Sequence, residues 1–127
     1  MKKIDEYTLP FEKLKTWHVA KDFAKRVYEV TKQFPAIEQY GLTSQIRRAA
    51  VSVMSNIAEG SARTSRKDEA HFSQLAYSSL MEVACQLQLS HEMGFLESEV
   101  YEELRRYVVE LSVKLNALRR SQLKDTL

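Results

Sequence analysis

The stretch from Gln45 to Gly60 most limits what this chain can fold into. Arg47 and Arg48 stand near its start and Glu59 near its end, and the ten residues between Arg48 and Glu59 carry no charge. A helix on the surface of a small soluble protein normally keeps one charged face toward water. Because this helix has no charge along its middle, we expect protein rather than water to cover most of it.

The composition favours a few long helices joined by short connections. The chain has 127 residues, enough for one domain with a single core. Its three Gly and two Pro are too few turn-formers for a many-stranded sheet. The single cysteine, Cys85, excludes an internal disulfide, and its apolar helical surroundings predict a buried, inert thiol. Without an apolar run for a signal peptide or a membrane span, we expect a cytoplasmic protein that does not interact with membranes.

Apolar residues recur at spacings of three and four in four segments of the chain. The segments cover approximately residues 15–34, 44–59, 66–93 and 97–123. With an N-terminal arm of residues 1–14, they predict an all-α fold, an antiparallel up-down four-helix bundle over residues 15–125. The helices over 44–59 and 66–93 lack a charged outer face. We therefore expect these two helices to form an interface between subunits.

Several residues are candidate helix terminators. Pro35 should end the helix over 15–34, because the residue before a proline is pushed out of the helical region. Thr43 or Ser44 is expected as the N-cap of the next helix, through a hydroxyl that accepts a hydrogen bond from a free backbone N–H. Gly60 and Gly94 are expected as C-terminal caps, where glycine takes the left-handed conformation.

The charges are segregated along the chain, although the net charge is only +2. No Lys or Arg occurs from Asp68 through Leu104, where eight acidic residues give a net charge of −8, so the remainder carries +10. Two interpretations are open. Oppositely charged surfaces pair within the domain or between subunits, or a basic surface binds an anionic polymer.

Basic residues near the uncharged helix are the candidates for phosphate contact. They are Arg47 and Arg48 at its start, Arg63, Arg66 and Lys67 beyond its end, and Lys21 and Lys25 on the helix over 15–34. A helix about 20 Å long separates the first pair from the next three, so one subunit cannot form one patch from all five. A ring of subunits could repeat either group into a basic rim that attracts phosphates, while simple solvated surface is the alternative.

The sequence contains no recognisable catalytic or cofactor-binding constellation. The nearest approach to a di-iron bundle site is a single Asp68-x-x-His71, without a second copy. No P-loop, dinucleotide fingerprint or hydrolase elbow is present. We expect a protein that is not an enzyme and has no catalytic residue, metal or cofactor.

Glu82 is the only formally charged residue from Ala70 to Ser90. A lone carboxylate in an uncharged helix is often buried and paired, so a structural or interfacial salt bridge, rather than a catalytic role, is expected, with Arg47, Arg48 and Arg63 as candidate partners.

The polar side of the helix over 44–59 has two interpretations. It consists of the small side chains of Ser52 and Asn56, followed by Glu59 just before Gly60. Asn56 and Glu59 either hydrogen-bond the loop that carries Arg63 and the start of the following helix, or form an exposed polar site at one end of the bundle.

Several short motifs occur together along most of the chain. They are Leu14-x-x-Trp17-x-x-Ala20, Phe34-Pro35, Tyr40-Gly41-Leu42-Thr43, Gln45-Ile46-Arg47-Arg48-Ala49-Ala50-Val51-Ser52, Asn56-Ile57-Ala58-Glu59-Gly60, Ser79-Leu80-x-Glu82 and Gly94-x-Leu96. Through these motifs, approximately residues 11–120 resemble the four-helix-bundle family of 23S rRNA-intervening-sequence proteins. The arm Met1–Pro10 lies outside the resemblance.

This resemblance implies a small bacterial protein that forms a ring-like homo-oligomer, with a pentamer expected. Family members are often labelled ribosomal proteins, and some are encoded within insertions of 23S rRNA genes. A related branch comprises the accessory proteins of diversity-generating retroelements, for which binding to nucleic acid and to a reverse transcriptase is implied. The family has no established catalytic residues. Our leading hypothesis is a homo-oligomer that binds RNA or DNA, and the alternative is a scaffold that binds a partner protein.

Overall fold

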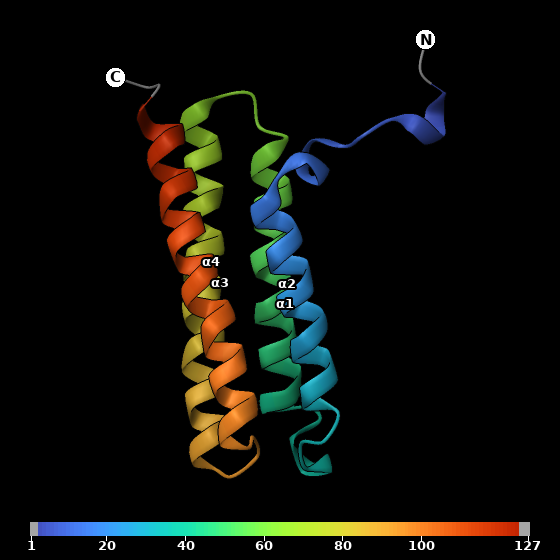
Figure 1. Ribbon diagram of the computed structural model, residues 1–127, viewed down its shortest axis with the longest axis vertical. Coiled ribbons are helices and arrows are strands. Elements are labelled where there is room, and N and C mark those ends of the chain that lie inside the picture. The colour runs from blue at the N-terminus through green and yellow to red at the C-terminus, as the bar shows by residue number, and fades with distance from the viewer. Residues whose placement is uncertain (1–2, 125–127) are drawn as a thin grey trace.

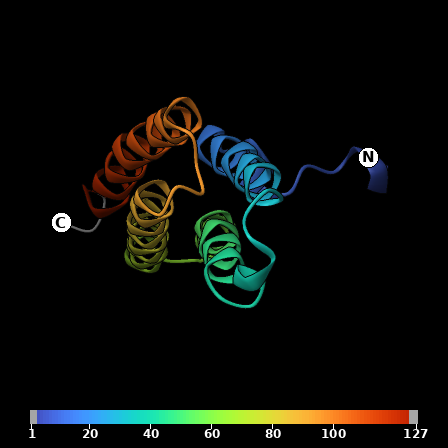
Figure 2. The same ribbon diagram turned by 90° about the horizontal axis from the view of Figure 1, so that it is seen from below.

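The computed structural model describes residues 3–124, which form an antiparallel bundle of four α-helices (Figure 1). The helices are α1 (Lys15–Thr31), α2 (Leu42–Ser61), α3 (Arg66–Glu92) and α4 (Ser98–Lys124), with 3-10 turns η1 (Ile4–Glu6), η2 (Pro10–Lys13) and η3 (Ala36–Glu38). Seen from below, the four helices occupy the corners of a quadrilateral in chain order (Figure 2). The predicted all-α bundle is confirmed. Met1 and Lys2 of the predicted arm and Asp125 of the predicted bundle lie outside the described residues.

Each helix turns one apolar face to the common core. The largest fully buried side chains are Phe23 and Val27 of α1, Ile46 and Val53 of α2, Leu80, Val83 and Leu87 of α3, and Leu104, Leu111 and Leu115 of α4. Within each helix these residues are separated by multiples of about one turn, which places them on one side. None of the helices described between residues 3 and 124 is both long and apolar enough to cross a membrane.

The start of α2 differs from the prediction because a side chain from the preceding turn caps it. The helix begins at Leu42, with Gly41 at the N-cap position. The carboxylate of Glu38 accepts a hydrogen bond from the Leu42 N–H at 3.1 Å. Thr43 is buried in the first turn and its hydroxyl has no hydrogen-bond partner, so the predicted cap at Thr43 or Ser44 was wrong.

The two glycines predicted as helix caps have different roles. Gly94 follows α3 with a φ of +81°, as a C-terminal cap requires, so this prediction is confirmed. Gly60 is buried inside α2, and the prediction of a cap there was wrong. A Cβ atom at Gly60 would lie 2.9 Å from the Cβ of Phe72, so glycine permits α2 and α3 to approach closely.

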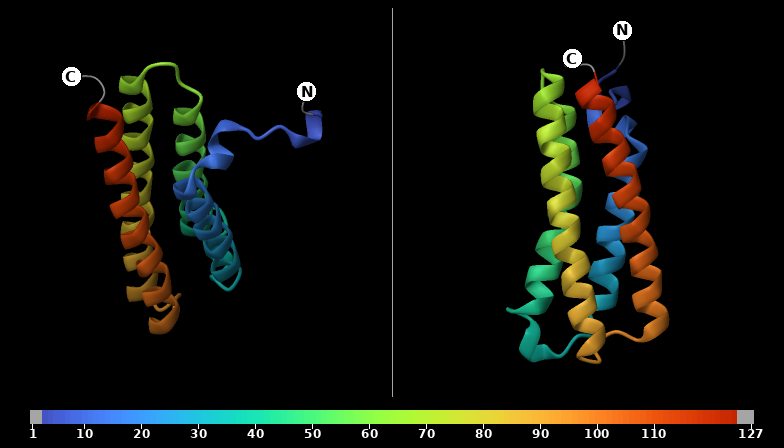
Figure 3. Two further views of the ribbon diagram at one scale, coloured as in Figure 1. Left: turned by 45° about the horizontal axis from the view of Figure 1, so that its top comes forward. Right: turned by 90° about the vertical axis from the view of Figure 1, so that its left-hand side faces the viewer.

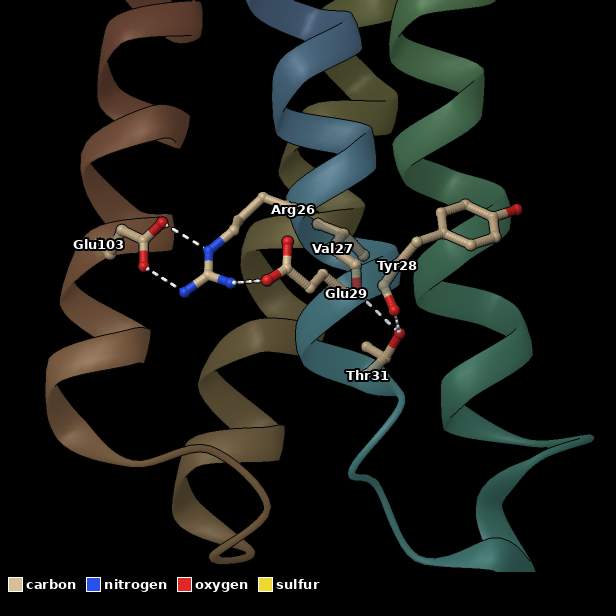
Figure 4. Close-up of polar contacts among 6 residues, drawn as sticks. All are labelled: Arg26, Val27, Tyr28, Glu29, Thr31 and Glu103. Atoms are coloured by element: carbon tan, nitrogen blue, oxygen red, sulfur yellow. Dashed lines mark hydrogen bonds and ion pairs between the residues drawn. The ribbon is translucent and has the colours of Figure 1, made fainter.

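A pair of parallel hydrogen bonds joins α1 to α4 (Figure 4). Arg26 donates from Nε to Glu103 Oε2 at 2.7 Å and from its second guanidinium nitrogen to Oε1 at 2.8 Å. The same guanidinium lies 3.1 Å from Glu29. Hydrogen bonds from Arg26 favour the ionised carboxylate and lower the pKa of Glu103 below its ordinary value.

We expect Glu103→Gln to lower the free energy of unfolding by about 1 kcal/mol at pH 7, the upper range for a partly exposed ion pair. The pKa of Glu103 is lower in the folded than in the unfolded chain, so the stabilisation is complete above the unfolded pKa. It is lost as pH falls from about 4.5 through the folded pKa. Urea denaturation of both proteins across this range measures the difference. Glu102→Gln, at an exposed neighbouring position, is the matched control. An equal loss of unfolding free energy in both variants would show that the Arg26–Glu103 pair is not the source of the stabilisation.

Candidate nucleic-acid interface

The outer sides of α1 and α2 form one continuous open surface, which we call the α1–α2 groove. One part is lined by Tyr28, Gln39, Tyr40, Thr43, Ser44, Arg47, Arg48 and Val51. The adjoining part is lined by Lys21, Ala24, Lys25, Tyr28, Glu29, Lys32, Val51 and Met54. Because the two parts share Tyr28 and Val51, they belong to the same surface.

Helical spacing explains why these side chains line one groove. Lys21, Lys25, Tyr28 and Lys32 follow one another at intervals of three or four residues, which places them along one side of α1. The antiparallel α2 packs beside α1 (Figure 2). The side chain of Tyr28 leaves α1 toward α2, whereas that of Arg26 leaves toward α4 (Figure 4). The groove is therefore on the opposite side of α1 from the ion pair with α4.

The α1–α2 groove is strongly positive. Its lining contains five basic side chains, those of Lys21, Lys25, Lys32, Arg47 and Arg48, and one acidic side chain, that of Glu29. The Glu29 carboxylate lies 3.1 Å from the Arg26 guanidinium, which it shares with Glu103, so its charge is partly offset. An open surface with clustered positive charge attracts a polyanion and can neutralise its phosphates.

Arg47 also holds α2 against the end of α1. Its Nε donates to the Thr31 hydroxyl at 2.8 Å, and a terminal nitrogen donates to the Tyr28 carbonyl at 3.2 Å. The guanidinium lies 4.8 Å from the centre of the Tyr28 ring. The last carbonyls of a helix lack intrahelical partners and favour a cation, so Arg47 stabilises the C-terminal end of α1. Arg47 is therefore partly a structural residue, whereas Arg48 is exposed.

The other predicted phosphate contacts lie at the opposite end of α2. Arg63 and Lys67 are exposed beside the α2–α3 connection, and the Arg63 guanidinium lies 4.4 Å from the centre of the Phe72 ring. Arg66 forms an ion pair with Glu69 at 2.9 Å. None of these three basic residues lines the α1–α2 groove.

The structure therefore brings together Lys21, Lys25, Arg47 and Arg48 of the predicted set and separates Arg63, Arg66 and Lys67 from them. Lys32, Tyr28 and Tyr40 also line the groove, although the sequence did not single them out as candidates. Only for Lys32 does the sequence indicate this place, through its helical spacing from Lys21 and Lys25.

The single chain does not bury Glu82. Its carboxylate is exposed and accepts a hydrogen bond from Gln86 at 3.2 Å. The predicted structural salt bridge was wrong within the chain, because Glu82 lies on the outer face of α3 while its neighbours Leu80 and Val83 face the core. An interfacial salt bridge of Glu82 with an arginine of another copy stays a prediction. Cys85, predicted to be buried, is also exposed on α3.

Ser52 connects α2 to α3 and also accepts hydrogen bonds from Asn56. The hydroxyls of Ser52 and Ser79 lie 2.8 Å apart. The Asn56 amide donates to the Ser52 carbonyl at 2.9 Å and to its hydroxyl at 3.1 Å. Asn56 thus has structural contacts, but with Ser52 rather than with the Arg63 loop, and Glu59 is exposed.

Residues 12–117 match the model of a family described as 23S rRNA-intervening sequence protein. A solved structure from Bacteroides thetaiotaomicron, a protein of unknown function from the S23 ribosomal protein family, is similar with a TM-score of 0.73. It is 23% identical, and the match covers 82% of this chain and 97% of that one, so it supports the fold. No curated protein matches. Because the match to the family model spans most of the chain, this chain belongs to the family of 23S rRNA-intervening sequence proteins.

Proposed function

We propose that this protein is a non-enzymatic, cytoplasmic homo-oligomer that binds RNA or another nucleic acid through the α1–α2 groove. The observation that carries this proposal is the excess of basic over acidic side chains along one open surface. The family description, which refers to 23S rRNA, agrees with an RNA ligand.

Apolar side chains on two other surfaces support the proposed homo-oligomer. On α3, Leu75 and Met81 are each 37% exposed and Leu89 is 49% exposed. On α4, Val109 is 54% exposed and Val113 is 64% exposed. The sequence predicted an interface formed by α2 and α3. The exposed apolar side chains favour a contact between the α3 surface of one copy and the α4 surface, rather than the α2 surface, of the next. Such a contact is heterologous and can close into a ring, and the family resemblance implies five copies. Light scattering that finds a stable 14.7 kDa monomer at micromolar concentration would contradict the proposed homo-oligomer.

Titration of a structured RNA at two salt concentrations tests nucleic-acid binding. If four side chains of the groove contact phosphates, raising the salt from about 50 to about 200 mM should weaken binding by about 50-fold or more, because the release of counterions is less favourable at the higher salt concentration. Fluorescence anisotropy with a labelled RNA measures the change. The proposal is wrong if no RNA binds at the lower salt concentration, or if the affinity does not depend on salt.

A scaffold for a partner protein is the second candidate, favoured by the exposed apolar side chains of α3 and α4. Affinity purification with and without nuclease separates the two functions. A partner held through RNA is lost after digestion, whereas a partner bound to the α3 or α4 surface is retained.

A further inference from the structure

The connection between α1 and α2 exposes two large apolar side chains. Ile37 of η3 is 89% exposed and Tyr40, just before α2, is 90% exposed. The connection stands out from the bundle beside the start of α2 (Figure 3, right). Neither side chain belongs to the hydrophobic core, so the packing of the bundle does not explain them.

Tyr40 differs from Ile37 because it also lines the α1–α2 groove. It shares a hollow of about 510 Å³ with Tyr28, Arg47 and Arg48. This volume is in the range of sites that hold a small ligand, although the hollow is open to solvent. An aromatic ring beside a basic groove is the arrangement by which proteins bind single-stranded nucleic acid, with bases stacked on rings and phosphates on cations.

Only one of the two tyrosines of this hollow has free ring faces. The Arg47 guanidinium covers Tyr28, at 4.8 Å from its ring centre, and Tyr28 is 42% exposed. For Tyr40, no ring or cation contact is found within residues 3–124. Tyr40 is therefore the available stacking platform, and its phenol ring offers a planar surface to a base of any identity.

The cations extend from this platform along α1. Lys32 and Lys21 are eleven residues apart, which is about 16 Å along a helix, with Lys25 between them. Arg48 lies in the same hollow as Tyr40. The bases of a duplex are stacked on each other and cannot reach a ring in this way, whereas unpaired bases can.

We propose that the α1–α2 groove binds a single strand, with one unpaired base stacked on Tyr40 and the neighbouring phosphates along Arg48, Lys32, Lys25 and Lys21. This inference rests on the proposed nucleic-acid function and specifies its ligand as unpaired rather than duplex nucleic acid.

Three labelled probes test this inference on the full chain: oligo(U), oligo(dT) and a blunt-ended, fully paired RNA duplex. We expect the wild-type protein to bind the single strands more tightly than the duplex. Tyr40→Ala should weaken oligo(U) binding by about 5- to 100-fold, the range found when one stacking platform is removed. The salt dependence should not change, because the substitution removes no charge.

Two further variants separate stacking from other effects. Tyr40→Trp keeps an aromatic surface and should retain the affinity within about twofold, while Tyr40→Ala does not. Ile37→Ala removes an equally exposed apolar side chain from the same connection and should leave the affinity unchanged. Both positions are exposed, so circular dichroism and light scattering should show the same folded oligomer for all variants.

The outcomes distinguish this inference from the function on which it rests. Salt-dependent binding of the duplex with no loss in Tyr40→Ala would overturn the stacking inference and leave nucleic-acid binding intact. Failure of the wild type to bind any probe at low salt would overturn both. Equal binding of oligo(U) and oligo(dT) supports the inference for single strands of either kind, and tighter oligo(U) binding supports it for RNA. The inference is also wrong if Tyr40→Ala binds all three probes like the wild type but loses a partner protein that the wild type retains after nuclease digestion.

Discussion

Reversing two charges of the α1–α2 groove, in the double variant Lys21→Glu with Lys25→Glu, should weaken RNA binding more than about tenfold at about 100 mM salt. Both lysines line the groove on α1. Each lost contact reduces the counterions released on binding, and each new carboxylate repels the phosphates. The slope of log affinity against log salt should become shallower by about 1.4 for a single strand and about 1.8 for a duplex. Fluorescence anisotropy at several salt concentrations measures both quantities.

The matched control for this variant is Lys13→Glu with Lys67→Glu. These lysines are exposed in η2 and in the first turn of α3, outside the groove and away from the α4 surface proposed as a subunit contact, and their reversal changes the net charge by the same amount. We expect an affinity within about threefold of the wild type, since charges farther than a Debye length are largely screened. Equal losses in the two double variants would show that RNA responds only to the total charge, and the α1–α2 groove would then be the wrong site.

Gly60→Ala should lower the free energy of unfolding by about 1–3 kcal/mol, as overpacking of a tight interior contact does. The added Cβ would lie 2.9 Å from the Cβ of Phe72 and 3.5 Å from the Glu69 carbonyl. The Cβ of Phe72 is fixed to the backbone of α3, so it cannot move aside as the end of a flexible side chain does. Urea denaturation measures the change.

Helix propensity predicts the opposite sign for the stability change of Gly60→Ala. Inside a helix, alanine is favoured over glycine by about 1 kcal/mol, so propensity alone predicts that this substitution stabilises the protein. The close approach of α2 and α3 predicts the reverse sign. Ser55→Ala, at an exposed position of α2, is the control and should change stability by less than about 0.5 kcal/mol. A more stable Gly60→Ala protein would rule out a close-packing role for Gly60.

The four helices could be predicted from the sequence because helical periodicity is a local property. Leu104, Leu111 and Leu115 recur on one side of α4 whatever that side contacts, and all three are fully buried in the bundle. Short connections leave neighbouring helices no arrangement other than antiparallel. The helices accordingly begin and end within three residues of the predicted positions.

Local signals failed where a contact from outside the helix decided the outcome. A hydroxyl at Thr43 fits the sequence pattern of an N-cap, yet the carboxylate of Glu38 takes that position from the preceding turn. Gly60 fits the pattern of a C-terminal cap, yet α2 continues to Ser61, and the glycine instead leaves room for Phe72 of α3. Glu82 was predicted to need a buried partner, but its place on the helix turns it to the surface.

The sequence by itself determined that the chain forms four helices around one apolar core and that its basic residues are segregated from its acidic ones. Only the tertiary structure decided which basic residues act together. Arg48 and Arg63 are close in sequence, but α2 separates them by most of its length. Lys25 and Arg48 are 23 residues apart, but the antiparallel pairing of α1 and α2 places both on one groove. A surface of this kind depends on which helices become neighbours, and that is settled by packing rather than by spacing along the chain.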